Sequence, residues 1–154
     1  MRKKRSGGWR GGVQKPTGKV FVLDTWAVLA YLQAEPAAQE VRQVLRRARR
    51  GEVSILFSII NFGECLYVIE RRHGVQRALS DANTIDQLAL EVVPADRPLV
   101  FAAARLKARY PISYADAFAA ALAKQYRARL MTGDPEFKAV EPEVAIHWLP
   151  GRRR

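Results

Sequence analysis

Four acidic residues stand close to the ends of predicted strands or the starts of predicted helices: Asp24, Glu64, Asp116 and Asp134. In open α/β sheets, ligands bind outside the carboxyl ends of the strands. Carboxylates crowded there without paired cations repel one another and take up protons. A hard divalent cation resolves that conflict, because Mg²⁺ is held by a few carboxylates together with waters and substrate phosphates. The pattern therefore points to metal-assisted hydrolysis of a phosphodiester.

Each acid also has a purely structural explanation when it is taken alone. Two of the acids lie three residues after Ser113 and Asn61, as in a capping box. The other two stand where helix caps and turns commonly attract acids. The metal hypothesis therefore depends on all four carboxylates meeting in space.

The elements that must position these acids alternate along the chain. Short apolar runs predict buried strands over residues 20–23, 53–57, 90–93, 129–132 and 145–148. Segments with helical spacing lie between them, and Ser58 and Asn61 are candidate caps for a helix over about 62–73. This alternation predicts an α/β fold with a mostly parallel sheet and helices on both faces. The carboxyl ends of parallel strands share one edge, so the acids are expected to converge there.

The charge is distributed unevenly over the 154 residues. The chain carries a net charge of +11, yet residues 20–151 account for only +1 of it. We predict a flexible basic arm over 1–18, one compact domain over 19–150 and a basic tail over 151–154. The arm either attracts a polyanion such as RNA or is a solubilising extension without a site.

Arginines also line one side of the helix predicted from residue 37 onward, among them Arg46 and Arg49. A solvated helix face explains such a pattern, and contact with the RNA backbone is the alternative.

Other classes of protein find little support in the sequence. The single cysteine, Cys65, allows no intrachain disulfide and no Cys-rich zinc site, which favours a reducing, cytoplasmic setting. No apolar run approaches the ~20 residues that a membrane span needs. Neither a P-loop nor a dinucleotide fingerprint is present. A phosphotransfer enzyme with Asp24 as nucleophile is an alternative, but Trp26 stands where aspartate phosphatases carry a second aspartate.

Four segments occur in an order that is informative as a set: 23–32, 58–64 followed by Tyr67, 113–118 and 132–137. Together they resemble the PIN-domain ribonucleases, and more narrowly the VapC-type toxins of type II toxin–antitoxin pairs. The resemblance implies a three-layer α/β/α sandwich and cleavage of RNA by an endonuclease that depends on Mg²⁺ or Mn²⁺. It assigns the metal-binding positions to Asp24, Glu64, Asp116 and Asp134.

The same resemblance implies supporting roles for Thr25, Ser58, Asn61 and Thr132 beside the acids. It also implies a homodimer and a cognate antitoxin whose tail enters the acidic cleft. Residues 1–18 depart from the pattern, because such toxins usually start close to the first strand. A housekeeping PIN nuclease in RNA processing and a non-catalytic RNA-binding module are the alternative functions.

Overall fold

The computed structural model describes residues 18–151, and within them five strands form one sheet. The strands are β1 (Lys19–Leu23), β2 (Val53–Ser58), β3 (Glu91–Val93), β4 (Arg129–Thr132) and β5 (Ile146–Trp148). Their order is β3-β2-β1-β4-β5, and every neighbouring pair is parallel. Apart from Gly18 and Gly151, the predicted basic arm and basic tail lie outside the described residues.

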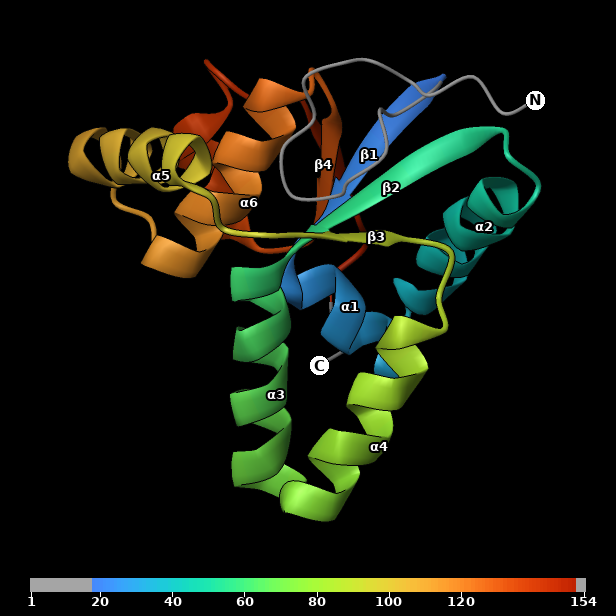
Figure 1. Ribbon diagram of the computed structural model, residues 1–154. Coiled ribbons are helices and arrows are strands. Elements are labelled where there is room, and N and C mark those ends of the chain that lie inside the picture. The colour runs from blue at the N-terminus through green and yellow to red at the C-terminus, as the bar shows by residue number, and fades with distance from the viewer. Residues whose placement is uncertain (1–17, 152–154) are drawn as a thin grey trace, which may run out of the picture.

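Helices cover both faces of this sheet (Figure 1). They are α1 (Thr25–Leu32), α2 (Ala38–Arg49), α3 (Ile59–His73), α4 (Val75–Asp86), α5 (Arg97–Arg109) and α6 (Tyr114–Gln125), with a 3₁₀ helix η2 (Pro135–Val140). Helices α5 and α6 lie on one face, and α1 to α4 lie on the other, where α3 and α4 form a hairpin that projects from the sheet.

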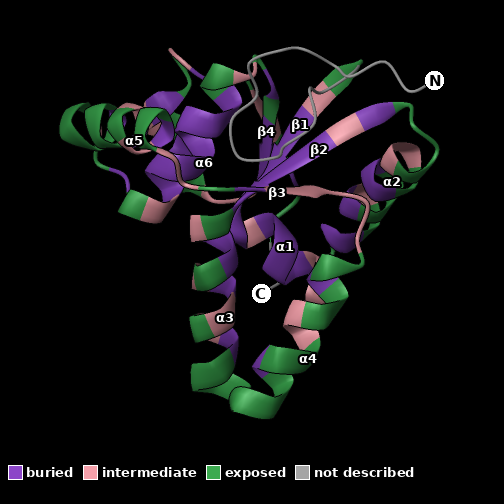
Figure 2. Cartoon of the chain, viewed as in Figure 1, coloured by how far each residue is buried: buried purple, intermediate pink, exposed green. Residues whose placement is uncertain are grey.

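The alternation of side chains along the strands explains why two apolar layers form. Val22 and Leu130 are register partners and pack under α5 and α6. Leu23 and Met131, the next pair, pack on the opposite face with α1, α2 and α3. Buried residues accordingly line the sheet and the inner helix faces, whereas the outer sides of α3, α4 and α5 are exposed (Figure 2). The predicted three-layer α/β/α sandwich is confirmed.

Helix α3 begins earlier than the sequence pattern predicts. Strand β2 runs directly into it, and the side chain of Ser58 caps it by accepting a hydrogen bond from the Ile60 amide at 3.2 Å. The predicted start near Phe62 is wrong, and Asn61 is no cap. Asn61 lies inside the first turn of α3 and is completely buried.

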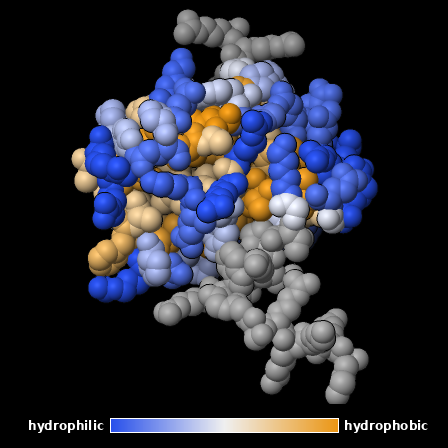
Figure 3. All heavy atoms as spheres, turned by 90° about the horizontal axis from the view of Figure 1, so that it is seen from above, coloured by the Kyte–Doolittle hydropathy of each residue, from blue (hydrophilic) through white to orange (hydrophobic). Residues whose placement is uncertain are grey.

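The surface is mostly polar in the view from above, where hydrophobic atoms show only in patches between hydrophilic side chains (Figure 3). None of the helices within residues 18–151 is both long enough and apolar enough to cross a membrane.

Candidate active site

The carboxyl edge of the sheet gathers acidic side chains from distant segments. Carboxylate oxygens of Asp116, Asp134 and Glu136 lie within 4.8 Å of one another. Asp24 and Glu64 are outside that group but interact with it electrostatically. The charges of Asp116 and Asp134 raise the pKa of Asp24, and the charge of Glu64 raises the pKa of Asp116. The structure therefore brings the four predicted acids into one electrostatic environment and adds Glu136 to it.

Asp24 is the most deeply buried of these acids, with 1% of its surface exposed. Its Oδ1 accepts a hydrogen bond from the Ala27 amide at 2.8 Å, which caps α1, and its Oδ2 accepts one from Thr132 Oγ1 at 2.6 Å. Burial raises the pKa of Asp24 to about 8, and nearby carboxylates add to the rise, while these two hydrogen bonds oppose it. The side chain of Asp24 can therefore cap α1 and also belong to the acidic site.

Asp116 occupies the first turn of α6, which starts after the N-cap Ser113. Burial is again the main cause that raises the pKa of Asp116, to about 7. The charges of Asp134, Glu64 and Glu136 raise it further, whereas hydrogen bonding with Ser113 opposes the rise. A nearby cation would strongly stabilise the ionised form of such a buried carboxyl.

Asp134 and Glu136 come from the turn that follows β4. The side chain of Asp134 caps η2 by accepting a hydrogen bond from the Glu136 amide at 3.0 Å. The sequence analysis included Glu136 in a matched segment but gave it no role. The available signal was its spacing: two acids separated by Pro135 at the start of a short turn can present both carboxylates to the same neighbour.

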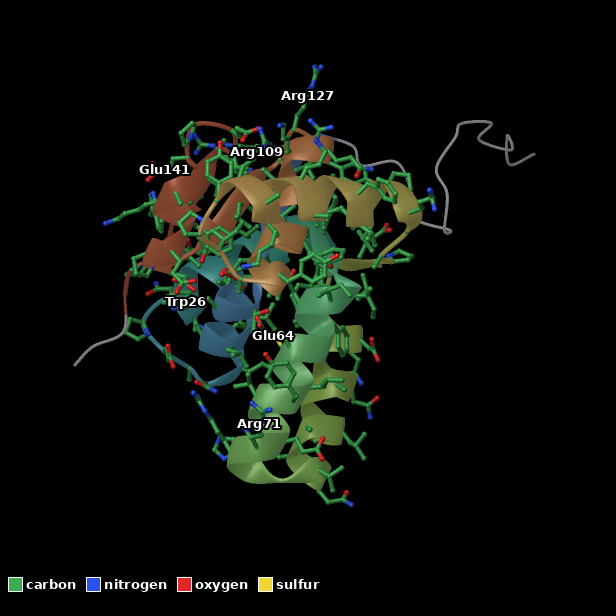
Figure 4. The ribbon with its side chains drawn as sticks, turned by 90° about the vertical axis from the view of Figure 1, so that its left-hand side faces the viewer. Trp26, Glu64, Arg71, Arg109, Arg127 and Glu141 are labelled. Atoms are coloured by element: carbon green, nitrogen blue, oxygen red, sulfur yellow. The ribbon has the colours of Figure 1, made fainter. Side chains whose placement is uncertain are left out.

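Glu64 lies on α3, on the side of the molecule that also shows Trp26 (Figure 4). The hydroxyl of Tyr67, one turn further along, donates to Glu64 Oε2 at 3.3 Å. The Glu64 charge is the main cause that raises the pKa of Tyr67. Glu64 is half-buried, and its charge helps to raise the pKa of Asp116.

The predicted supporting residues differ in what they contact. The Asn61 amide group donates to Thr25 Oγ1 at 3.1 Å and to the Ala115 carbonyl at 3.2 Å, which joins the first turns of α1, α3 and α6. Thr132 bonds Asp24 directly and also accepts from the Asp134 amide at 3.0 Å. Ser58 caps the start of α3 by accepting a hydrogen bond from the Ile60 amide. Asn61 Oδ1 has no hydrogen-bond partner within residues 18–151, which is costly for a buried acceptor.

No lysine, arginine or histidine among the described residues forms an ion pair with the five acids. Helix α2 lies beyond α1 from α6 (Figure 1). Arg46 and Arg49 are exposed on α2, and neither forms an ion pair with the acids. An uncompensated set of carboxylate oxygens at this spacing fits a hard divalent cation such as Mg²⁺ or Mn²⁺.

Comparison with known proteins agrees with this arrangement. The sequence pattern of the PIN domain family matches residues 21–142. This match covers most of the chain, and the protein belongs to the PIN domain family. A comparison with curated protein sequences finds no significant match.

Solved structures with the same fold share little sequence with the chain. VapBC2 from Rickettsia felis, bound to a DNA fragment from its promoter, has a TM-score of 0.68 at 18% identity, covering 85% of this chain and 99% of that one. DNA-bound VapBC from Salmonella typhimurium has a TM-score of 0.66 at 20% identity, covering 85% and 98%. VapC20 from Mycobacterium tuberculosis, described as a toxin that cleaves the sarcin–ricin loop, has a TM-score of 0.58 at 19% identity, covering 86% and 99%.

Proposed function

We propose that this protein is an endoribonuclease dependent on a divalent metal, and that Asp24, Glu64, Asp116 and Asp134 hold the metal with help from Glu136. The observation that carries the proposal is the group of carboxylate oxygens within 4.8 Å, backed by buried Asp24 and lacking any paired cation in the described chain. PIN domains are generally nucleases, which supports the same conclusion.

The roles of the individual residues follow from their contacts. A Mg²⁺ or Mn²⁺ ion held by these residues would activate a water molecule and stabilise charge on the phosphate. Asp24 and Asp116 would have to give up protons to hold the cation, because burial raises their pKa values to about 8 and about 7. Thr132 holds Asp24 in place, and Asn61 joins the helix starts that carry Asp24 and Asp116.

The alternative in which Asp24 is a phosphorylated nucleophile fits poorly. Both of its oxygens accept hydrogen bonds and the side chain is almost completely buried, whereas a nucleophile needs an open approach for in-line attack. A metal ligand needs only one lone pair that faces its neighbours.

RNA cleavage by the purified chain tests the proposal. We expect cleavage with Mg²⁺ or Mn²⁺, none with EDTA, and none from Asp116→Asn. The matched control is Glu141→Gln, which removes one exposed carboxylate at the end of η2, away from the site. Asp116→Asn cutting as fast as the wild type would refute the metal assignment. If RNA binding survives EDTA and no added metal produces cleavage, the protein is a non-catalytic RNA-binding module.

We further propose that the nuclease is the toxin of a toxin–antitoxin pair, acts in the cytoplasm and forms a homodimer. The support is the fold shared with VapBC proteins, together with large apolar side chains exposed on α3 and α5, namely Ile59, Tyr67 and Phe101. Such side chains favour burial against a partner.

Induced expression with and without the neighbouring open reading frame tests this second proposal. Growth arrest that the neighbour relieves, and that Asp116→Asn abolishes, is the expected result. Harmless overexpression of a chain that still cuts RNA would instead indicate a housekeeping nuclease. Light scattering of the purified chain tests the homodimer.

A further inference from the structure

The aromatic ring of Trp26 lies directly against the backbone of Gly133. A Cβ added to Gly133 would stand 2.2 Å from Cη2, 2.4 Å from Cζ2 and 2.6 Å from Cζ3 of the indole, distances that real atoms do not adopt. The φ angle of Gly133 is not in the left-handed region, so the backbone itself would accept any residue. The indole ring is therefore the nearest obstacle to a side chain at this position.

Both residues of this contact adjoin acids of the site. Trp26 stands two residues after Asp24, and Gly133 directly precedes Asp134. Hydrogen bonds also restrain the turn, among them those of Thr132, which donates to Asp24 and accepts from the Asp134 amide. The ring adds support through van der Waals contact.

Trp26 is itself held firmly. It is half-buried in the first turn of α1 and packs against the apolar layer formed by α1, α2 and α3. An indole has few rotatable bonds and a large contact area, so it makes a rigid support. Figure 4 shows it on the same side of the molecule as Glu64.

We propose that Trp26 is a positioning residue for the metal site. Its ring, seated on Gly133, sets the turn that carries Asp134 and Glu136 at the separation from Asp116 that a divalent cation can bridge. This inference rests on the proposed metal-dependent function. Residues behind a metal site typically change affinity or activity by about 10–100-fold when they are mutated.

Binding of Mn²⁺, measured by calorimetry or electron paramagnetic resonance, is the main readout, with RNA cleavage and thermal unfolding measured in parallel. We expect Gly133→Ala to lower Mn²⁺ affinity about tenfold or more, because the added methyl displaces the ring or the turn. Trp26→Ala should lower it too, because the turn loses its support. In the Trp26→Ala background, Gly133→Ala should cost little or restore affinity, since the clash is gone.

Gly63→Ala is the matched control. Gly63 also directly precedes an acid, Glu64, but nothing beyond its own helix lies within 4 Å of a Cβ added there, and its φ is not left-handed. It should keep Mn²⁺ affinity and raise the melting temperature slightly, because alanine favours the helix.

The proposal is overturned if Gly133→Ala binds Mn²⁺ as the wild type does, or if the effects of the two single substitutions simply add. Should Gly133→Ala fail to fold, Trp26→Ala and Trp26→Phe decide, and unchanged Mn²⁺ affinity in Trp26→Ala overturns it. A wild type that binds Mn²⁺ but cuts no RNA removes the proposed nuclease function and leaves Trp26 to be judged on affinity. A wild type that cuts RNA, with Trp26→Ala equal to it in both assays, removes only the positioning role.

Discussion

Helix α6 connects two regions that treat carboxylates in opposite ways. At its start, Asp116 stands among other acids and has no cation beside it within the described chain. In its last turn, Lys124 donates to Glu143 at 2.6 Å. Arg109 donates to the same carboxylate at 3.1 Å, and the hydroxyl of Tyr110 bonds it as well. Glu143 thus has three donors, whereas the acids at the other end have no positively charged donor within residues 18–151.

The pKa values express this contrast. Hydrogen bonds from Lys124 and Tyr110 hold the pKa of Glu143 down at about 2. Burial raises the pKa values of Asp24 and Asp116 to about 8 and about 7. The charge of Glu143 is neutralised by its two cations. Through these ion pairs, Glu143 joins α5, α6 and the segment before β5. Buried carboxyls without cations are unstable as anions, which fits the metal site proposed at the other end of α6.

The largest expected effect comes from neutralising the buried acid of the site. Asp24→Asn should reduce RNA cleavage on the order of 1,000-fold, because an amide is a poor ligand for a hard cation and loses the charge that the cation requires. Rates measured with excess Mn²⁺ check this. A loss of less than tenfold would contradict the role of Asp24.

Asp24→Asn should also change how the stability of the metal-free protein depends on pH. In the metal-free wild type, the folded chain holds a proton on Asp24 that the unfolded chain releases near pH 4. The free energy of unfolding should therefore fall as the pH rises from about 4 to about 8. Asp24→Asn lacks this contribution, so its unfolding should depend less on pH over that window.

The pH dependence of metal binding should be the next largest effect. Asp24 and Asp116 have to lose protons when the cation binds, so Mn²⁺ affinity should rise about 500-fold between pH 6 and pH 8 and level off above about pH 8. Calorimetry in buffers of different ionisation enthalpy would also count the protons released. Affinity that is flat over this range would show that both acids are already ionised.

The cation-paired end of α6 should respond in stability and not in cleavage. Glu143→Gln leaves Arg109 and Lys124 without their shared anion, so the melting temperature should fall by about 3 °C while Mn²⁺ affinity stays unchanged. The pKa of Glu143 is depressed, so its contribution is present above about pH 4.5 and disappears as the pH falls toward 2. The gap between the two melting curves should close in that range. Glu141→Gln, nearby and exposed, is the control.

The smallest expected effect concerns the basic face of α2. If Arg46 and Arg49 hold the RNA backbone, replacing both with serine should raise the KM for RNA about two- to threefold and leave kcat unchanged. The effect should shrink at high salt. An unchanged KM at low salt would show that these arginines are only a solvated helix face.

Local patterns predicted much of the fold. The apolar runs located all five described strands, and the alternation of strands and helices predicted the parallel sheet. The predicted start of α3 was wrong by three residues. Asparagine is a common N-cap residue, but the side chain of Asn61 donates hydrogen bonds to α1 and α6 instead. Glu136 was missed because its spacing from Asp134 shows only that both carboxylates can point the same way, and only the structure shows that Asp116 lies beside both.

The sequence by itself determined where the strands end and the helices begin, because these boundaries depend on neighbouring residues. It therefore also determined that the acids lie at one edge of the sheet. Only the tertiary structure decided which groups touch. Asp24 and Thr132 are 108 positions apart, and Trp26 meets Gly133 at a similar separation. No local propensity encodes such contacts, because they arise from the packing of complete layers. Burial, which sets the pKa values of Asp24 and Asp116, exists only after that packing is complete.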